Sequence, residues 1–284
     1  MTRPRKILVA YDGSPHSKDA LRWAIYFKRL LGSSVRAVKV FEPFGYYESR
    51  GDIDSSIGPT LLRQAENARA CAEKMLEDIK HEAANQNVVI ETELAIGNAA
   101  TGILDRAKQY KADMIIAGTR GRGALEALLV GSVTGKLVSL AHVPVMVVKN
   151  CQVASNDGLK KILVAYDGSP QSRDALAWAM DLAVGADAQI FAVKVFEPLP
   201  LTVMYTMPEA GIASRLSEKL TEIQEADVKL MEEVKEIGRK QKMEIRTEIL
   251  HGEAASSILG CAKRHGVDLI VAGTRGHGTL EGLL

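Results

Sequence analysis

The chain has 284 residues, of which 46% are hydrophobic and 25% charged, and its 36 basic and 35 acidic residues leave a net charge of +1. This composition is typical of globular proteins, and the balanced charge gives no support for a general nucleic-acid-binding or anionic-membrane surface. No apolar run reaches the roughly 20 residues that a membrane span needs. The 3 cysteines are far apart in the sequence, which indicates neither a disulfide framework nor a zinc site. We therefore expect a cytoplasmic protein with about two domains of about 150 residues each.

Hydrophobic periodicity in the first half predicts strands and helices that alternate. Short runs rich in Val and Ile predict strands at residues 6–11, 35–41, 88–95, 113–117 and 143–148. Amphipathic spacing predicts helices at residues 17–31, 61–84, 99–110 and 132–141, and a long loop at residues 42–59. Such alternation predicts a doubly wound parallel sheet of about five strands, flanked by helices, that binds ligands beyond the carboxyl ends of its strands.

The second half of the chain repeats the first. The ten residues that begin at Lys6 recur letter for letter from Lys161, and those that begin at Ala117 recur for five residues from Ala272. The constant offset predicts two tandem α/β domains, which we place at residues 1–150 and 159–284 with a linker at residues 151–158. The segment that begins at Gly131 has no counterpart in the second half of the sequence as far as Leu284. We therefore expect the second domain to lack the last helix and strand of the first.

A glycine-rich stretch follows the strand at residues 113–117 and carries the strongest chemical signal. Gly118, Gly121 and Gly131 precede Ser132, where a helix is predicted to begin. Backbone N–H groups at such a turn can hold a phosphate, and Arg122 can add positive charge. The alternative is a glycine loop with Ser132 as a helix cap. The spacing matches neither the P-loop nor the dinucleotide-binding fingerprint.

Asp12 ends the first strand, and Asp167 is its repeat. Either carboxylate can accept hydrogen bonds from ribose hydroxyl groups, or can simply begin a turn, as Asp before Gly often does. We expect Asp12, Val40 and Gly118 to lie along one edge of the sheet, since each lies at or near the end of a strand. The six histidines show no metal-ligand spacing, and we identify no general base, so we predict neither a metal centre nor a catalytic group.

The combined motifs resemble the universal stress protein family over nearly the whole chain. Gly118, Gly121, Gly131 and Ser132 match the G-x2-G-x9-G-[ST] pattern of its ATP-binding branch. The resemblance implies ATP as the ligand, accompanied by Mg²⁺ and hydrolysed at most slowly, and a role in the stress response. It implies ribose contact at Asp12, adenine contacts through the backbone at Tyr11 and Val40, and nucleotide or phosphate contacts at Ala117, Gly118, Gly121, Gly131, Ser132 and Val133.

In the second copy the matching residues are Asp167, Val195, Gly273 and Gly276. Family domains often pair through their fifth strands, so the segment at residues 143–148 is expected to pair with a second chain in a homodimer. Two alternatives remain open at this point. One is an adenylating enzyme of a related fold, whose loop motifs are missing here. The other is an interaction protein without nucleotide, with the apolar loop at residues 199–207 as its contact surface.

Overall fold

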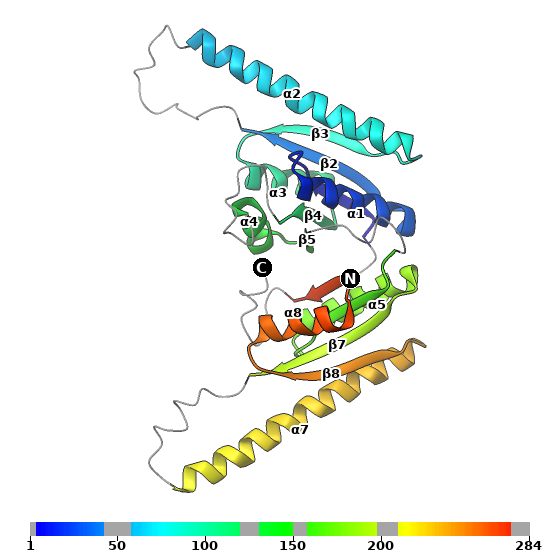
Figure 1. The fold of residues 1–284 in the computed structure, drawn as a ribbon, viewed down its shortest axis with the longest axis vertical. Coiled ribbons are helices and arrows are strands. Elements are labelled where there is room, and N and C mark those ends of the chain that lie inside the picture. Colours follow the sequence, from blue (N-terminus) through cyan, green and yellow to red (C-terminus); the bar gives the residue numbers. More distant parts are fainter. Residues whose placement is uncertain (1–3, 43–57, 120–130, 150–157, 198–209, 274–284) are drawn as a thin grey trace. The chain divides into compact units, whose positions relative to one another are not determined.

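The computed structural model describes residues 4–42, 58–119, 131–149, 158–197 and 210–273. Its contacts divide the chain into two compact units, one within residues 4–156 and the other within residues 157–284 (Figure 1). The predicted linker lies almost wholly outside the described residues, so the domain boundaries stay a prediction. No helix in the described part of the chain is long and apolar enough to cross a lipid bilayer.

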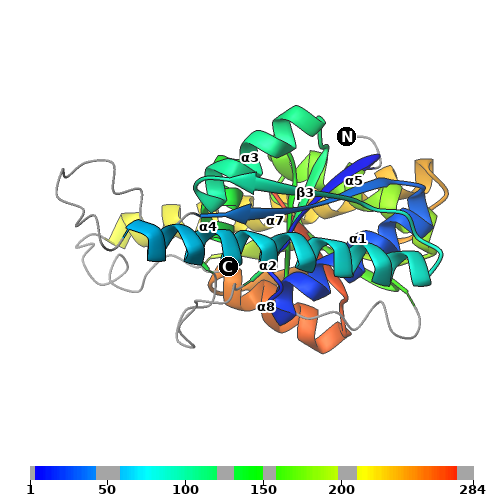
Figure 2. The same cartoon turned by 90° about the horizontal axis from the view of Figure 1, so that it is seen from above.

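The first unit is an α/β structure built on one parallel sheet, in the order β3-β2-β1-β4-β5. Its strands are β1 Lys6–Ala10, β2 Ser34–Phe41, β3 Glu91–Ile96, β4 Met114–Gly118 and β5 Val145–Val148, and its helices are α1 Pro15–Leu31, α2 Gly58–Asn85, α3 Ala99–Tyr110 and α4 Ser132–Leu140. Helices α3 and α4 share a buried cluster with the strands on one face. Right-handed crossovers place α1 and α2 on the opposite face, and Figure 2 shows α2 and α3 on opposite sides of β2 and β3.

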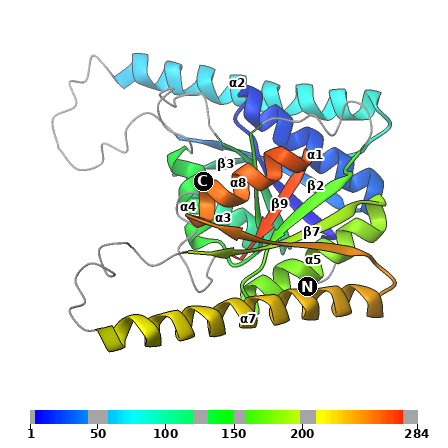
Figure 3. The same ribbon diagram turned by 60° about the horizontal axis from the view of Figure 1, so that its bottom comes forward.

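The second unit repeats this arrangement with four strands in the order β8-β7-β6-β9. Its strands are β6 Lys161–Ala165, β7 Gln189–Phe196, β8 Ile245–His251 and β9 Leu269–Ala272, and its helices are α5 Pro170–Ala186, α7 Ala210–Lys240 and α8 Ala254–His265. Figure 3 shows α7 and α8 on opposite sides of this sheet. The predicted fold class, two tandem α/β units with parallel sheets, is therefore confirmed.

Four predicted starts were wrong by two or three residues, and one of them is that of β5, which begins at Val145 rather than at residue 143. Helix α1 begins at Pro15 because Ser14 caps it, accepting a hydrogen bond from the Ser17 N–H at 3.2 Å. Helix α2 begins at Gly58 rather than at residue 61. Strand β3 begins at Glu91 rather than at residue 88, because the chain first leaves α2 through a residue with positive φ, Asn87.

Candidate functional site at the carboxyl edge

The strand order reverses between β1 and β4 in the first unit. Ala10 of β1 pairs with Ala117 of β4, so the residues that follow these strands lie next to each other at the carboxyl edge. Val40 lies near the end of β2, the other neighbour of β1. The expectation that Asp12, Val40 and Gly118 share one edge is therefore confirmed. A point of strand reversal is where open α/β sheets bind ligands.

Asp12 is a turn-former in this structure. Its Oδ1 accepts a hydrogen bond from the Ser14 N–H at 2.9 Å, and its own N–H donates to Ser17 Oγ at 3.3 Å. Asp167 makes the same two contacts in the second unit, with Ser169 and Ser172, at 3.0 and 3.4 Å. This turn is by itself a sufficient reason for an aspartate at the position. It also fixes the partly buried carboxylate at the edge of the sheet.

The side chains of Tyr11, Val40 and Ala117 are buried, with exposed fractions of 4%, 8% and 2%. The Tyr11 N–H donates to the Val38 carbonyl at 2.9 Å, and a Cβ placed on Gly102 would contact Val40 at 3.2 Å. A ligand at this edge would therefore meet the backbone of these residues rather than their side chains. In the second unit, Val195 packs against the corresponding cluster and its carbonyl accepts a hydrogen bond from Lys194 Nζ at 2.9 Å.

Gly118 lies against the first turn of α1. A Cβ at this position would come within 2.7 Å of the carbonyl carbon and the Cβ of His16. Its repeat, Gly273, is equally close to α5, where a Cβ would lie 2.8 Å from the Cβ of Gln171. Sequence reasoning assigned these glycines to ligand approach, whereas close helix–strand packing alone requires a residue without a side chain at both positions.

Helix α4 begins at the same edge, with Gly131 at its N-cap and no side-chain cap. The Gly131 N–H donates to the Thr119 carbonyl at 2.7 Å, and Thr134 Oγ1 donates to the Gly118 carbonyl at 2.7 Å. These two bonds hold the start of α4 against the end of β4. The first N–H groups of a helix have no intrahelical partner, so this end presents backbone donors and the positive end of the helix dipole.

The side chains at the start of α4 differ in their surroundings. Ser132 is exposed, whereas Val133 packs against the buried cluster and has only its backbone to offer a ligand. The hydroxyl oxygen of Thr119 is buried and has no hydrogen-bond partner among the residues that the structure describes. Of the other predicted residues, Gly121, Arg122 and Gly276 lie outside the described residues, so their roles stay predictions.

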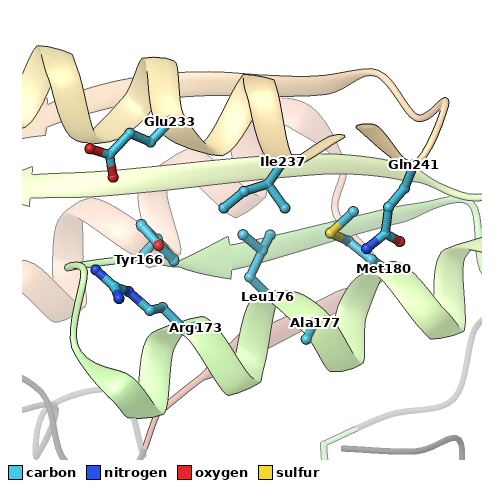
Figure 4. Close-up of a pocket in the computed structure, with 8 residues that line it drawn as sticks. All are labelled: Tyr166, Arg173, Leu176, Ala177, Met180, Glu233, Ile237 and Gln241. Carbon is cyan, nitrogen blue, oxygen red and sulfur yellow. The ribbon is translucent and has the colours of Figure 1, made fainter. Parts of the chain in front are cut away.

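A separate cavity of about 280 Å³ lies between α5 and α7 in the second unit (Figure 4). Its lining consists of Tyr166, Arg173, Leu176, Ala177, Met180, Glu233, Ile237 and Gln241. Figure 4 shows Tyr166 and Arg173 at one end and Gln241 at the other, so the cavity runs along the helices rather than across the carboxyl edge. It does not coincide with the predicted nucleotide site.

One side-chain cluster in the second unit was missed by sequence reasoning. Glu248 on β8 lies beside Cys261 and His265 on α8, with one ligand atom of each residue within 4.8 Å of the others. The available signal was the spacing of Cys261 and His265, four residues apart on a predicted helix, which places them on one face. Their third member could not be found without the packing of α8 on β8.

A sequence model described as "Universal stress protein family" matches residues 4–149 and 158–284. A universal stress protein of Mycolicibacterium smegmatis is 28% identical over 285 residues, which cover 98% of this chain and 90% of that protein. A solved universal stress protein of Archaeoglobus fulgidus is 20% identical with a TM-score of 0.68, over 98% of this chain and 90% of that one, and so supports the fold alone.

Another solved universal stress protein is in complex with cAMP, so some members of the family bind nucleotides. It is 18% identical over 52% of this chain with a TM-score of 0.34, which is too distant to locate a site here. The family match covers both repeated halves of the sequence and agrees with the two parallel sheets. The chain belongs to the universal stress protein family, as a tandem of two family domains.

Proposed function

We propose that this tandem universal stress protein binds ATP in its first unit, with Mg²⁺ accompanying the phosphates, and acts as a nucleotide-dependent sensor or binder in the cytoplasmic stress response. One observation carries the proposal. The uncapped start of α4 is bonded to the end of β4, at the edge where the strand order reverses and where the Asp12 carboxylate is held. Backbone donors and a carboxylate at one edge suit the two polar parts of a nucleotide.

In this proposal the Asp12 carboxylate accepts hydrogen bonds from the ribose hydroxyls, and the backbone of Tyr11 and Val40 faces adenine. Ala117 and Gly118 flank the nucleotide. The phosphates lie against Gly121, Arg122, Gly131, Ser132 and Val133. In the second unit, Asp167, Val195, Gly273 and Gly276 repeat part of this set.

The first test is calorimetric titration of the whole protein with MgATP. We expect saturable binding that Gly131→Val abolishes, because a branched side chain at the N-cap would occupy the space in front of the backbone donors. The φ of Gly131 is −68°, which valine adopts without strain. Gly135→Ala, one turn later on α4, is the matched control, because a Cβ there has no neighbour within 4 Å. Unchanged affinity in a folded Gly131→Val protein would refute the phosphate assignment.

The second test compares the repeated aspartates. Asp12→Asn keeps one oxygen for the Ser14 N–H, but it removes the charge and replaces the second accepting oxygen with an NH2 donor. We expect ATP to bind about 10–100-fold more weakly, the effect of one charged hydrogen bond. Asp167→Asn is the matched control and should leave the high-affinity site unchanged. Equal losses from the two variants would contradict the assignment to the first unit.

A further inference from the structure

Two side chains, those of Cys261 and His265, converge on one carboxylate oxygen of Glu248. Glu248 Oε2 lies 3.6 Å from Cys261 Sγ and 3.1 Å from His265 Nε2. Cys261 is buried, with an exposed fraction of 1%, whereas the side chains of Glu248 and His265 are 38% and 36% exposed. Among the described residues, this is the only group of three Cys, His, Asp or Glu side chains close enough to share an ion.

These separations are those of a tetrahedral zinc site. With Zn–S of about 2.3 Å and Zn–N and Zn–O of about 2.0–2.1 Å, a tetrahedron places the oxygen about 3.5 Å from the sulfur and about 3.3 Å from the nitrogen. The observed 3.6 and 3.1 Å differ from these values by about 0.2 Å or less. The ligand atoms of Cys261 and His265 lie within 4.8 Å of each other, against about 3.5 Å in the tetrahedron, so an ion fits among the three atoms once these two side chains move closer together.

Neighbouring residues hold two of the three side chains in place. The Phe191 ring packs against the His265 imidazole, with centroids 4.8 Å apart, and fixes its orientation. Arg264 donates to the other carboxylate oxygen, Oε1 of Glu248, at 2.7 Å, and so leaves Oε2 directed at Cys261 and His265. Such outer contacts orient the ligands of metal sites, although the Arg264 charge also opposes a cation and should lower the affinity.

The repeat supplies an internal comparison. At the positions 155 residues earlier, the first unit has Glu93, Arg106 and Tyr110 in place of Glu248, Cys261 and His265. There Arg106 Nε forms an ion pair with Glu93 Oε1 at 3.1 Å, and Arg36 binds the other oxygen of Glu93. The first unit therefore pairs both oxygens of this carboxylate with arginines, whereas in the second unit Arg264 pairs with one oxygen and the other faces a thiol and an imidazole.

We propose that Glu248, Cys261 and His265 bind a Zn²⁺ ion, with water from the open side as the fourth ligand. Thiolate and imidazole ligands suit zinc, and three protein ligands with a free position are typical of zinc sites open to substrate or solvent. On binding, the Cys261 thiol releases its proton to solvent and its sulfur bonds the metal. His265 binds through Nε2 and keeps its proton on Nδ1, and Glu248 Oε2 binds as a carboxylate.

This site is independent of the proposed nucleotide edge. The His265 carbonyl accepts a hydrogen bond at 2.7 Å from Lys161 Nζ, the first residue of β6. The cluster therefore lies toward the amino ends of the strands, opposite the edge that carries Asp167.

The test is titration of the reduced, metal-free whole protein with Co²⁺, which substitutes for Zn²⁺ and reports on its ligands by absorption. We expect one Co²⁺ per chain with a thiolate-to-cobalt charge-transfer band, which Zn²⁺ displaces. Cys261→Ala should remove the band. His265→Gln should weaken binding by more than about 100-fold, since even outer-shell changes cost 10–100-fold.

Matched controls separate this site from other thiols and from misfolding. Cys71→Ala removes an exposed thiol on α2 and Glu93→Gln alters the repeat position, and both should leave the band unchanged. Circular dichroism confirms that each variant is folded. The proposal is overturned if folded wild-type protein shows no charge-transfer band at excess Co²⁺, or if the band survives Cys261→Ala.

Discussion

Single residues at the carboxyl edge serve the fold as well as the proposed ligand. Asp12 closes a turn by accepting a hydrogen bond from the Ser14 N–H. Gly118 lets β4 lie so close to α1 that the methyl group of an alanine would not fit between them. Loss of nucleotide binding on replacing either residue therefore needs a separate measurement of folding. The variants Gly131→Val and Asp12→Asn are therefore sharper probes of the site than a substitution of Gly118.

At Gly118 we predict a loss of stability that does not depend on ligand. In Gly118→Ala the new methyl group would meet the His16 backbone at 2.7 Å, and backbone cannot rotate away, so the free energy of unfolding should fall by about 1–3 kcal/mol. The measurement is urea unfolding followed by the fluorescence of buried Trp23, in a Trp178→Phe background.

The matched control for this prediction is Gly135→Ala. A Cβ at Gly135, inside α4, has no neighbour within 4 Å, so alanine should stabilise the first unit by about 0.5–1 kcal/mol. Equal effects of the two alanines would show that packing against His16 does not restrict position 118.

Equivalent helices in the two units begin with different capping residues. Asn98 caps α3, accepting a hydrogen bond from the Thr101 N–H at 3.4 Å. Glu253 caps α8 in the corresponding place, accepting from the N–H groups of Ala255 and Ser256 at 2.9 and 2.8 Å. Hydrogen bonding to Ser256 and Ala255 lowers the pKa of Glu253, so only the second unit has an acid-sensitive cap on this helix.

We therefore predict that Glu253→Asn reduces the acid sensitivity of the second unit. Because the pKa of Glu253 is lower in the folded state, its stabilising effect is complete above the ordinary glutamate pKa of about 4.3 and is lost as the pH falls through the lower folded value. The free energy of unfolding of the wild type minus that of the variant should therefore be constant above that pH and should fall as the pH drops through the lower folded value. The measurement is unfolding against pH, followed by Trp178 fluorescence in a Trp23→Phe background. A wild-type free energy of unfolding that does not fall relative to that of the variant on acidification would contradict the prediction.

At the scale of the whole molecule, β5 is the edge strand of the first sheet, and no other described strand pairs with its outer side. The carbonyls of Pro144 and Val148 bond to residues at the start and end of β4. Since backbone groups alternate in direction along a strand, those of Val145 and Val147 face outward. We propose that this edge pairs with a second copy of the chain.

We predict a dimer in sedimentation experiments on the wild-type chain. Val147→Pro should shift it to a monomer, because proline removes an outward-facing N–H without altering the pairing with β4. Val89→Pro, at an exposed residue outside the strands, is a control for the general effect of proline and should remain dimeric. A wild-type monomer at high concentration would count against pairing through β5.

The sequence by itself determined the fold class and the duplication, because helical and strand periodicities and a constant offset between repeats are properties of the chain alone. It also identified Asp12, Val40 and Gly118 as residues of one edge, since strand ends in a parallel sheet necessarily lie together. It placed the starts of α1 and β3 a few residues away from where they are, because a Ser-Pro cap and a positive φ at Asn87 decide those boundaries locally.

Only the tertiary structure decided which neighbours these residues have. The contact of Gly118 with His16 depends on how α1 packs on β4, and the convergence of Glu248 with Cys261 and His265 depends on how α8 packs on β8. Neither packing leaves a pattern within a single element. Periodicity specifies which face of a helix is buried, whereas the side chains that meet across that face are set by the register between elements far apart in the chain.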